Sequence, residues 1–78
     1  MRRVDVEVDV HFDINGKMFP SMMTWEDGRV FVIERILDIR QAASLKAGGQ
    51  GIRYQCCIAN KEMHLWFENP KWFALAED

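Results

Sequence analysis

The sequence has little of what marks a secreted or membrane-spanning protein. Its two cysteines, Cys56 and Cys57, are adjacent, whereas the disulfide frameworks of small secreted domains use spaced pairs. No apolar run approaches the roughly 18 residues of a membrane helix. Arg2 and Arg3 are not followed by the continuous apolar segment of a signal peptide. These absences predict a protein of the reducing cytoplasm with no membrane partner.

A strong charge of either sign is also missing. The formal net charge is -2 at pH 7, so non-specific attraction of the whole molecule to nucleic acid is not expected. The chain has 78 residues, 49% of them hydrophobic, which suffices for one small core. We therefore expect a single domain over residues 1–78, to which a partner or self-association would add stability.

Motifs for catalysis and cofactor binding are absent as well. The glycine-rich stretch "AGGQG" lacks the lysine and hydroxyl residue of a phosphate-binding loop, and no serine stands in a nucleophile motif. A zinc site would need Cys56, Cys57, His11 and His64, but adjacent residues of a strand point to opposite faces. We expect no enzyme, no cofactor, no metal and no small-molecule substrate. Cys56 is predicted to lie in the core, and Cys57 to face outward with its reactivity left open.

What the sequence does contain is a two-residue alternation of apolar and polar side chains, which is typical of strands. The first stretch, "VDVEVDVHFDI", places Val4 to Ile14 on one parity, predicted to face inward, and the acids on the other. Asn15-Gly16 follows and predicts a type I′ hairpin turn. Turn signals at Gly28, Asn60 and Asn69 separate further runs at 17–25, 29–40, 52–59, 62–68 and 71–76.

Three places in these runs are less regular. Pro20 predicts an edge position or a bulge. Residues 29–40 fit either a strand or a short helix, and we favour a strand with a bulge near Glu34–Arg35. That strand would carry on one parity Phe31, Ile33, Leu37 and Ile39. The stretch "QAASLKAGGQG" is the one predicted loop, with a helical turn over 42–45 as an option.

These runs define a fold class. Six short antiparallel strands cannot make two broad sheets, but they can curl and so hide most of their edges. We predict an all-β fold, a small meander of about six antiparallel strands that forms an SH3-like or similar small barrel, or a strongly bent sheet. The strand order and the closure of the barrel stay open at this point.

The acids Asp5, Glu7 and Asp9 form a ladder that suggests a binding site. Alternate residues of a strand lie about 7 Å apart, which is too far for these carboxylates to share one ion, and no calcium-loop pattern is present. A pair of glycosidase carboxylates would also need a cleft. The ladder therefore fits a solvated strand face that keeps an edge soluble, with docking of a basic protein partner as the alternative.

Basic and aromatic residues give the only functional indication. The segment 29–61 carries six basic and two acidic side chains, and Arg53, His64 and Trp66 share the outward parity. Small barrels hold single-stranded nucleic acid with cations beside an exposed ring; alternatively, Trp66 closes one end of the core and the cations only solubilise the surface. Trp72 either anchors a partner or covers the barrel end. The candidate partner-binding residues are Trp66, Trp72, Arg35, Arg40, Lys46 and Arg53.

Two stretches, "DGRVFVIERILDIRQA" and "GIRYQCCIANKEMHLWFENPKWFAL", carry a resemblance. Over about residues 27–75 the chain resembles a group of short bacterial proteins for which no activity is established. In that group a glycine-turn strand, an arginine-bearing strand, an Arg-Tyr strand and a closing Trp-Phe strand follow one another. The resemblance implies a small, barrel-like bacterial β domain and no particular substrate.

The combined expectation is a non-catalytic interaction module. Its first expected function is to bind a protein partner or to self-associate as a homodimer, through exposed apolar residues such as Trp66 or Trp72. The alternative is a nucleic-acid-binding small barrel that uses the basic segment 29–61 together with exposed aromatic side chains.

Overall fold

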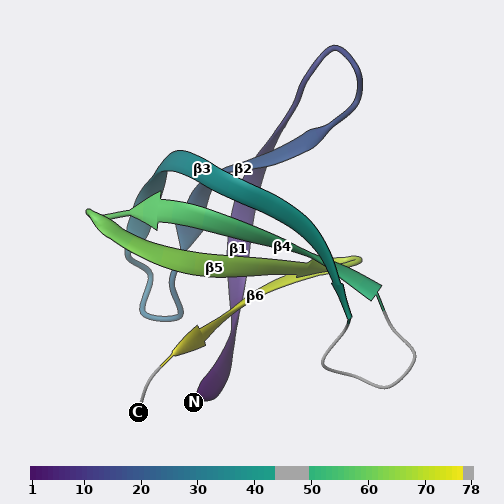
Figure 1. Ribbon diagram of the computed structural model, residues 1–78. Helices are drawn as coiled ribbons and strands as arrows, with labels where there is room; N and C mark the ends of the chain where they lie inside the picture. Colours follow the sequence, from purple (N-terminus) through teal and green to yellow (C-terminus); the bar gives the residue numbers. More distant parts are fainter. Residues whose placement is uncertain (44–49, 77–78) are drawn as a thin grey trace.

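The computed structural model, which describes residues 1–43 and 50–76, is a six-stranded antiparallel β-barrel (Figure 1). Its strands are β1 (Arg2–Phe12), β2 (Met18–Thr24), β3 (Val30–Ala43), β4 (Gln50–Ile58), β5 (Lys61–Glu68) and β6 (Lys71–Ala76). Each strand pairs with the next, and β6 returns to pair with β1, which closes the barrel. The predicted all-β meander is confirmed, and it is closed.

The turn between β1 and β2 differs from the predicted type I′ geometry. Only Gly16 has a positive φ there, 81°, and its amide donates to the Asp13 carbonyl at 2.9 Å. The Asp13 carboxylate accepts from the amides of Asn15 and Lys17 at 2.8 and 2.9 Å. This loop is a type I turn followed by a left-handed glycine. The predicted turn type is wrong because Asp13, rather than Asn15, organises the loop.

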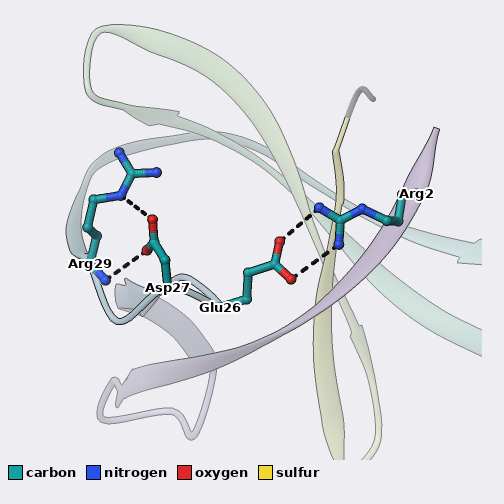
Figure 2. Close-up of polar contacts among 4 residues, drawn as sticks. All are labelled: Arg2, Glu26, Asp27 and Arg29. Atoms are coloured by element: carbon teal, nitrogen blue, oxygen red, sulfur yellow. Dashed lines mark hydrogen bonds and ion pairs between the residues drawn. The ribbon is translucent and has the colours of Figure 1, made fainter.

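The turn between β2 and β3 repeats this arrangement. Gly28 has φ 90°, its amide donates to the Trp25 carbonyl at 2.9 Å, and Asp27 accepts from the side chain and the amide of Arg29 (Figure 2). The type I′ turn occurs instead between β4 and β5, where Ala59 and Asn60 have φ 52° and 62°.

The pairing of β3 with β4 shifts register twice, between Ile33 and Arg35 and between Ile36 and Asp38. The first shift confirms both the predicted strand and its bulge near Arg35. The first shift also turns Ile36 towards the core and leaves Leu37 39% exposed, and the second restores the parity so that Ile39 packs inward. The predicted inward position of Leu37 is therefore wrong, since an added bulge reverses the parity of the residues around it.

The bulge predicted at Pro20 is also present. Asp9 pairs with Met22 and Val10 pairs with Pro20, so Ser21 is the extra residue on β2. Of the helical turn offered for residues 42–45, residues 42–43 end β3 and the others lie outside the described residues.

The core lies inside the barrel and comes mainly from β4, β5 and β6. Tyr54, Cys56 and Leu65 are almost completely buried, and the ring centroids of Tyr54 and Trp72 lie 5.3 Å apart. The Tyr54 hydroxyl donates to the Met18 carbonyl at 2.7 Å. This hydrogen bond connects Tyr54, in the centre of the core, with Met18 at the start of β2.

β1 follows the inward pattern only in its first half. Val4 is buried and Val8 is half-buried, but Phe12 is 58% exposed and Ile14 is 100% exposed. Their predicted inward position is wrong, because β6 pairs only with Arg2–Val6. The second half of β1 and the first half of β2 extend as a hairpin beyond the barrel, away from the two termini (Figure 1).

Candidate interaction surfaces

The second half of β1 has one unpaired side. Residues 7–12 pair with β2, and in the described part of the chain no strand pairs with their other side. We call this side the open edge. An unpaired strand edge presents amide and carbonyl groups on which another extended chain can build.

The direction of the backbone groups along the open edge follows from one contact. The carbonyl of Asp9 faces β2, where it accepts a hydrogen bond from Ser21 Oγ at 3.0 Å. Backbone groups of successive residues in a strand point to opposite sides. The amides and carbonyls of Val8, Val10 and Phe12 therefore face the open side.

A groove runs beside the open edge. Its volume is about 660 Å³, which is within the roughly 300–1,000 Å³ of ordinary binding sites. Its charged lining residues are Asp5, Glu7 and Lys71. Its apolar lining residues come from β1 and the start of β2 on one side, and from the end of β5, the turn after it and the start of β6 on the other: Val6, Val8, Val10, Met18, Phe67, Pro70 and Trp72.

The acidic ladder lies on the outer face of the same strand. Asp5, Glu7 and Asp9 are exposed, and Asp5 accepts from Arg3 Nε at 3.2 Å. On the half of β1 that β2 does not reach, Arg2 contacts Glu26 through both carboxylate oxygens, at 3.2 and 2.8 Å (Figure 2). The Arg2 guanidinium holds the pKa of the Glu26 carboxyl below its usual value, through its hydrogen bonds first and its charge second.

A second surface surrounds Trp66 on the outer face of β4, β5 and β6. Arg53 and Phe73 pair with Trp66 from its two neighbouring strands. The Arg53 guanidinium lies 5.9 Å from the ring centroid of Trp66, and the parallel Phe73 ring lies 5.8 Å away on the other strand. Arg3 covers Phe73 at 4.0 Å. Trp66 is half-buried in this stack, so much of its ring is already in contact with protein.

The basic residues predicted for nucleic-acid binding are only partly brought together. Arg40 lies directly opposite Arg53 in the β3–β4 pair, and Asp38 accepts from Arg40 Nε at 2.7 Å. Arg35 is exposed and pairs with Cys57. Lys46 lies outside the described residues.

Trp72 is buried rather than exposed. It is 7% exposed and packs between Tyr54 and Phe67, with ring centroids at 5.3 and 4.9 Å. The prediction of an exposed Trp72 is therefore wrong, whereas the alternative that it covers the barrel end, and its use in partner binding, stay predictions. Trp72 pairs with Val6, where the interior has room for a large ring.

The adjacent cysteines occupy opposite faces of β4, as predicted. Burial raises the pKa of the Cys56 thiol to about 11. The half-buried Cys57 donates to Glu34 Oε1 at 3.4 Å, and this hydrogen bond, with burial and the carboxylate charge, raises the pKa of Cys57. A raised pKa lowers the thiolate fraction, which is the nucleophilic form. Among the described residues, no three His, Cys, Asp or Glu side chains gather as metal ligands would.

A further apolar patch lies on the outer face of β2 and β3. Met22 pairs with Val32 and Thr24 pairs with Val30, and both valines are about 60% exposed. This patch lies on β2 and β3, outside the lining of the groove, and it serves below as a control surface.

No protein family, curated protein or solved structure matches the chain. The resemblance to short bacterial proteins thus stays an expectation. Within residues 1–43 and 50–76, the structure contains no helix long and apolar enough to cross a membrane.

The two-residue alternation predicts neither the open edge nor the exposure of Val10, Phe12 and Ile14. A signal for them exists in the strand lengths. The first alternating stretch has 11 residues and the last run has six. If these two pair to close a barrel, about half of the longer strand must extend past its neighbour.

Proposed function

We propose that the protein is a non-catalytic interaction module that binds an extended protein segment along the open edge of β1. The observation that carries this proposal is the unpaired edge at residues 7–12 with a groove of about 660 Å³ beside it. Addition of a strand supplies main-chain hydrogen bonds, and side-chain pockets next to the edge add specificity. Protein segments are therefore the ligands that this geometry suits.

The exposed apolar residues beside the edge support the same proposal. Phe12 and Ile14 occupy the inward parity, yet they have no barrel wall to face. Charges on an edge normally prevent unwanted pairing, and here the exposed acids Glu7 and Asp9 have the parity opposite to Val8, Val10 and Phe12. A bound strand with apolar residues towards the groove and basic or hydrogen-bonding residues outward would complement both faces.

The test is a selection of displayed random peptides on the wild-type protein, followed by binding measurements on two variants. Val10→Pro removes an amide that faces the open side, so it should leave the barrel intact. Val32→Lys changes the 61% exposed control patch. We expect selected peptides to bind wild type and Val32→Lys equally and to lose binding to Val10→Pro. Peptides that bind a folded Val10→Pro as well as wild type, or no selected peptides, would contradict the proposal.

Nucleic-acid binding is a second candidate because Arg40 and Arg53 lie opposite each other beside Trp66. Two like charges in directly opposed positions destabilise a sheet, and a phosphate between them would relieve this. Against it, Trp66 already contacts Arg53 and Phe73, which leaves less of its ring for a base to stack on. Gel shifts with single- and double-stranded DNA and RNA at low salt test it. Binding that Arg40→Ala and Arg53→Ala abolish supports this candidate, and absence of a shift removes it.

The remaining expectations belong to the same proposal. We place the protein in a reducing bacterial cytoplasm, and the free thiols of Cys56 and Cys57 agree with that compartment. An SH3-like relationship of the barrel is part of the proposal too, and the small size and antiparallel meander of the barrel support it.

A further inference from the structure

We infer that the segment bound at the open edge is β1 of a second copy of this chain, paired antiparallel about a two-fold axis at Val10. This inference rests on the proposed function, because it names the occupant of the same edge. Closed two-fold dimers are the commonest assemblies of identical chains, and their interfaces use the same surface twice. An edge that is complementary to itself meets that requirement.

The backbone determines which registers are available. Val8, Val10 and Phe12 turn their amides and carbonyls to the open side, whereas Val6 is already paired with Trp72. An axis at Val10 joins Val10 to its own copy and Val8 to Phe12 of the second copy. Each of these three residue pairs exchanges two main-chain hydrogen bonds. An axis at Val8 or Asp9 would need Val6, and an axis further along would run past the end of β1.

The outer side chains favour the same register. With the axis at Val10, Asp9 lies opposite His11 of the second copy, so the imidazole can donate to the carboxylate. An axis at Asp9 would place two copies of Asp9 opposite each other in the middle of the pair. Carboxylates in directly opposed positions repel. The axis at Val10 leaves one acidic pair, Glu7 opposite Asp13, at each end, where Asp13 lies beyond β1 and its carboxylate accepts from the amides of its own turn. Only the register at Val10 therefore combines three bonded pairs with the Asp9–His11 pair on the outer face.

The inner side chains bring the exposed apolar residues of the hairpin into the groove. Phe12 of the second copy lies opposite Val8, on the side lined by Phe67 and Trp72. Its 58% exposed ring would be withdrawn from water by this contact. The interface involves one strand from each copy, which is near or below the roughly 1,200 Å² typical of stable complexes. We therefore expect a concentration-dependent dimer.

The first experiment is sedimentation equilibrium of the full chain over a wide concentration range. We expect wild type and Val32→Lys to dimerise with similar affinity and Val10→Pro to stay monomeric. Exchange of Asp9 and His11, which lie opposite each other on the outer face of the proposed pair, is a sharper test. His11→Asp alone places two carboxylates opposite each other and should weaken the dimer by about tenfold or more. The double exchange Asp9→His with His11→Asp should restore it. The inference would be overturned if Val10→Pro dimerised with the affinity of wild type, or if the double exchange dimerised no more tightly than His11→Asp alone.

The second experiment keeps the inference testable if Val10→Pro fails to fold. In a Cys57→Ser background, Val10→Cys places one thiol at the axis, where bonded antiparallel residues have Cα atoms about 5.5 Å apart, a spacing that suits a disulfide. Mild oxidation should link two chains in this variant and not in the Val32→Cys control. A wild type that is monomeric at every concentration, with no linkage of Val10→Cys, would refute the homodimer. It would leave the peptide selection as the separate test of edge binding.

Discussion

The β4–β6 wall and the β1–β2 hairpin are made from the same kind of sequence and have opposite environments. In the wall, Tyr54, Cys56 and Leu65 alternate with polar residues and are buried. In the hairpin, Phe12 and Ile14 continue an equally regular alternation and are exposed. The difference lies in the neighbours, since β5 is paired on both sides and residues 7–12 of β1 on one. Alternation thus predicts a strand, and burial depends on what that strand packs against.

The largest contrast between the two regions is expected for truncation of one apolar side chain in each. Leu65→Ala removes a completely buried side chain and should lower the free energy of unfolding by about 2–5 kcal/mol. Ile14→Ala, at the exposed tip, should change it by less than about 0.5 kcal/mol. Urea denaturation monitored by tryptophan fluorescence measures both. Equal losses would mean that the tip is packed in solution and the contrast is wrong.

A smaller contrast is expected for the two turns that share one geometry. Gly16→Ala and Gly28→Ala each place a Cβ at a positive φ with no atom within 4 Å, so the cost is conformational, about 1–2 kcal/mol. The hairpin can open locally while the barrel stays folded. The stability that Gly16→Ala removes from the folded protein therefore cannot exceed the free energy of this local opening. We therefore expect the larger loss for Gly28→Ala. Denaturation of both variants, with hydrogen exchange of the hairpin amides, checks this order, and a larger loss at Gly16 contradicts it.

Tyr54→Phe tests the bond that connects the two regions. It removes the donor to the Met18 carbonyl at 2.7 Å and should cost about 0.5–1.5 kcal/mol. The hairpin amides should lose more protection from hydrogen exchange than those of β5. A uniform loss of protection would show that this hydroxyl stabilises the barrel as a whole rather than the hairpin.

The smallest effect is expected at the Arg2–Glu26 ion pair, which is exposed to solvent. Arg2→Ala should return the pKa of Glu26 upward to its ordinary value, because the donor that lowers it is gone. The change in unfolding free energy should be too small to resolve. NMR titration of the Glu26 carboxyl measures the pKa. An unchanged pKa would show that the contact in Figure 2 does not persist in solution.

Much of this architecture is predictable because it rests on local rules. The strand runs follow from alternation, the inward side of β4 follows from Tyr54 and Cys56, and the bulge follows from the interruption at Arg35. Asn15-Gly16 predicts a type I′ turn, but that turn type occurs at Ala59–Asn60. In the first loop the Asp13 carboxylate, two residues before Asn15, accepts from the loop amides and selects another geometry.

The candidate site was less predictable because it depends on contacts between distant parts of the chain. The burial of Phe73 is an example, for it lies on the outer face and is covered by Arg3. The open edge similarly arises from the pairing of strands of unequal length. Charge alone predicts Arg35, Arg40 and Arg53 as binding residues, and their joint role in nucleic-acid binding stays a prediction.

The pairing of β1 with β6 has a consequence for the order of folding. Every other pair joins strands that follow each other in the chain, whereas this one pairs Arg3 with Leu75, 72 positions later (75 − 3). Contacts so distant in sequence close the largest loop and form slowly. We expect the barrel to close last, with the whole length of β1 available to other chains until then. The half of β1 that closure leaves unpaired is thus the surviving part of a longer edge that every newly folding chain exposes.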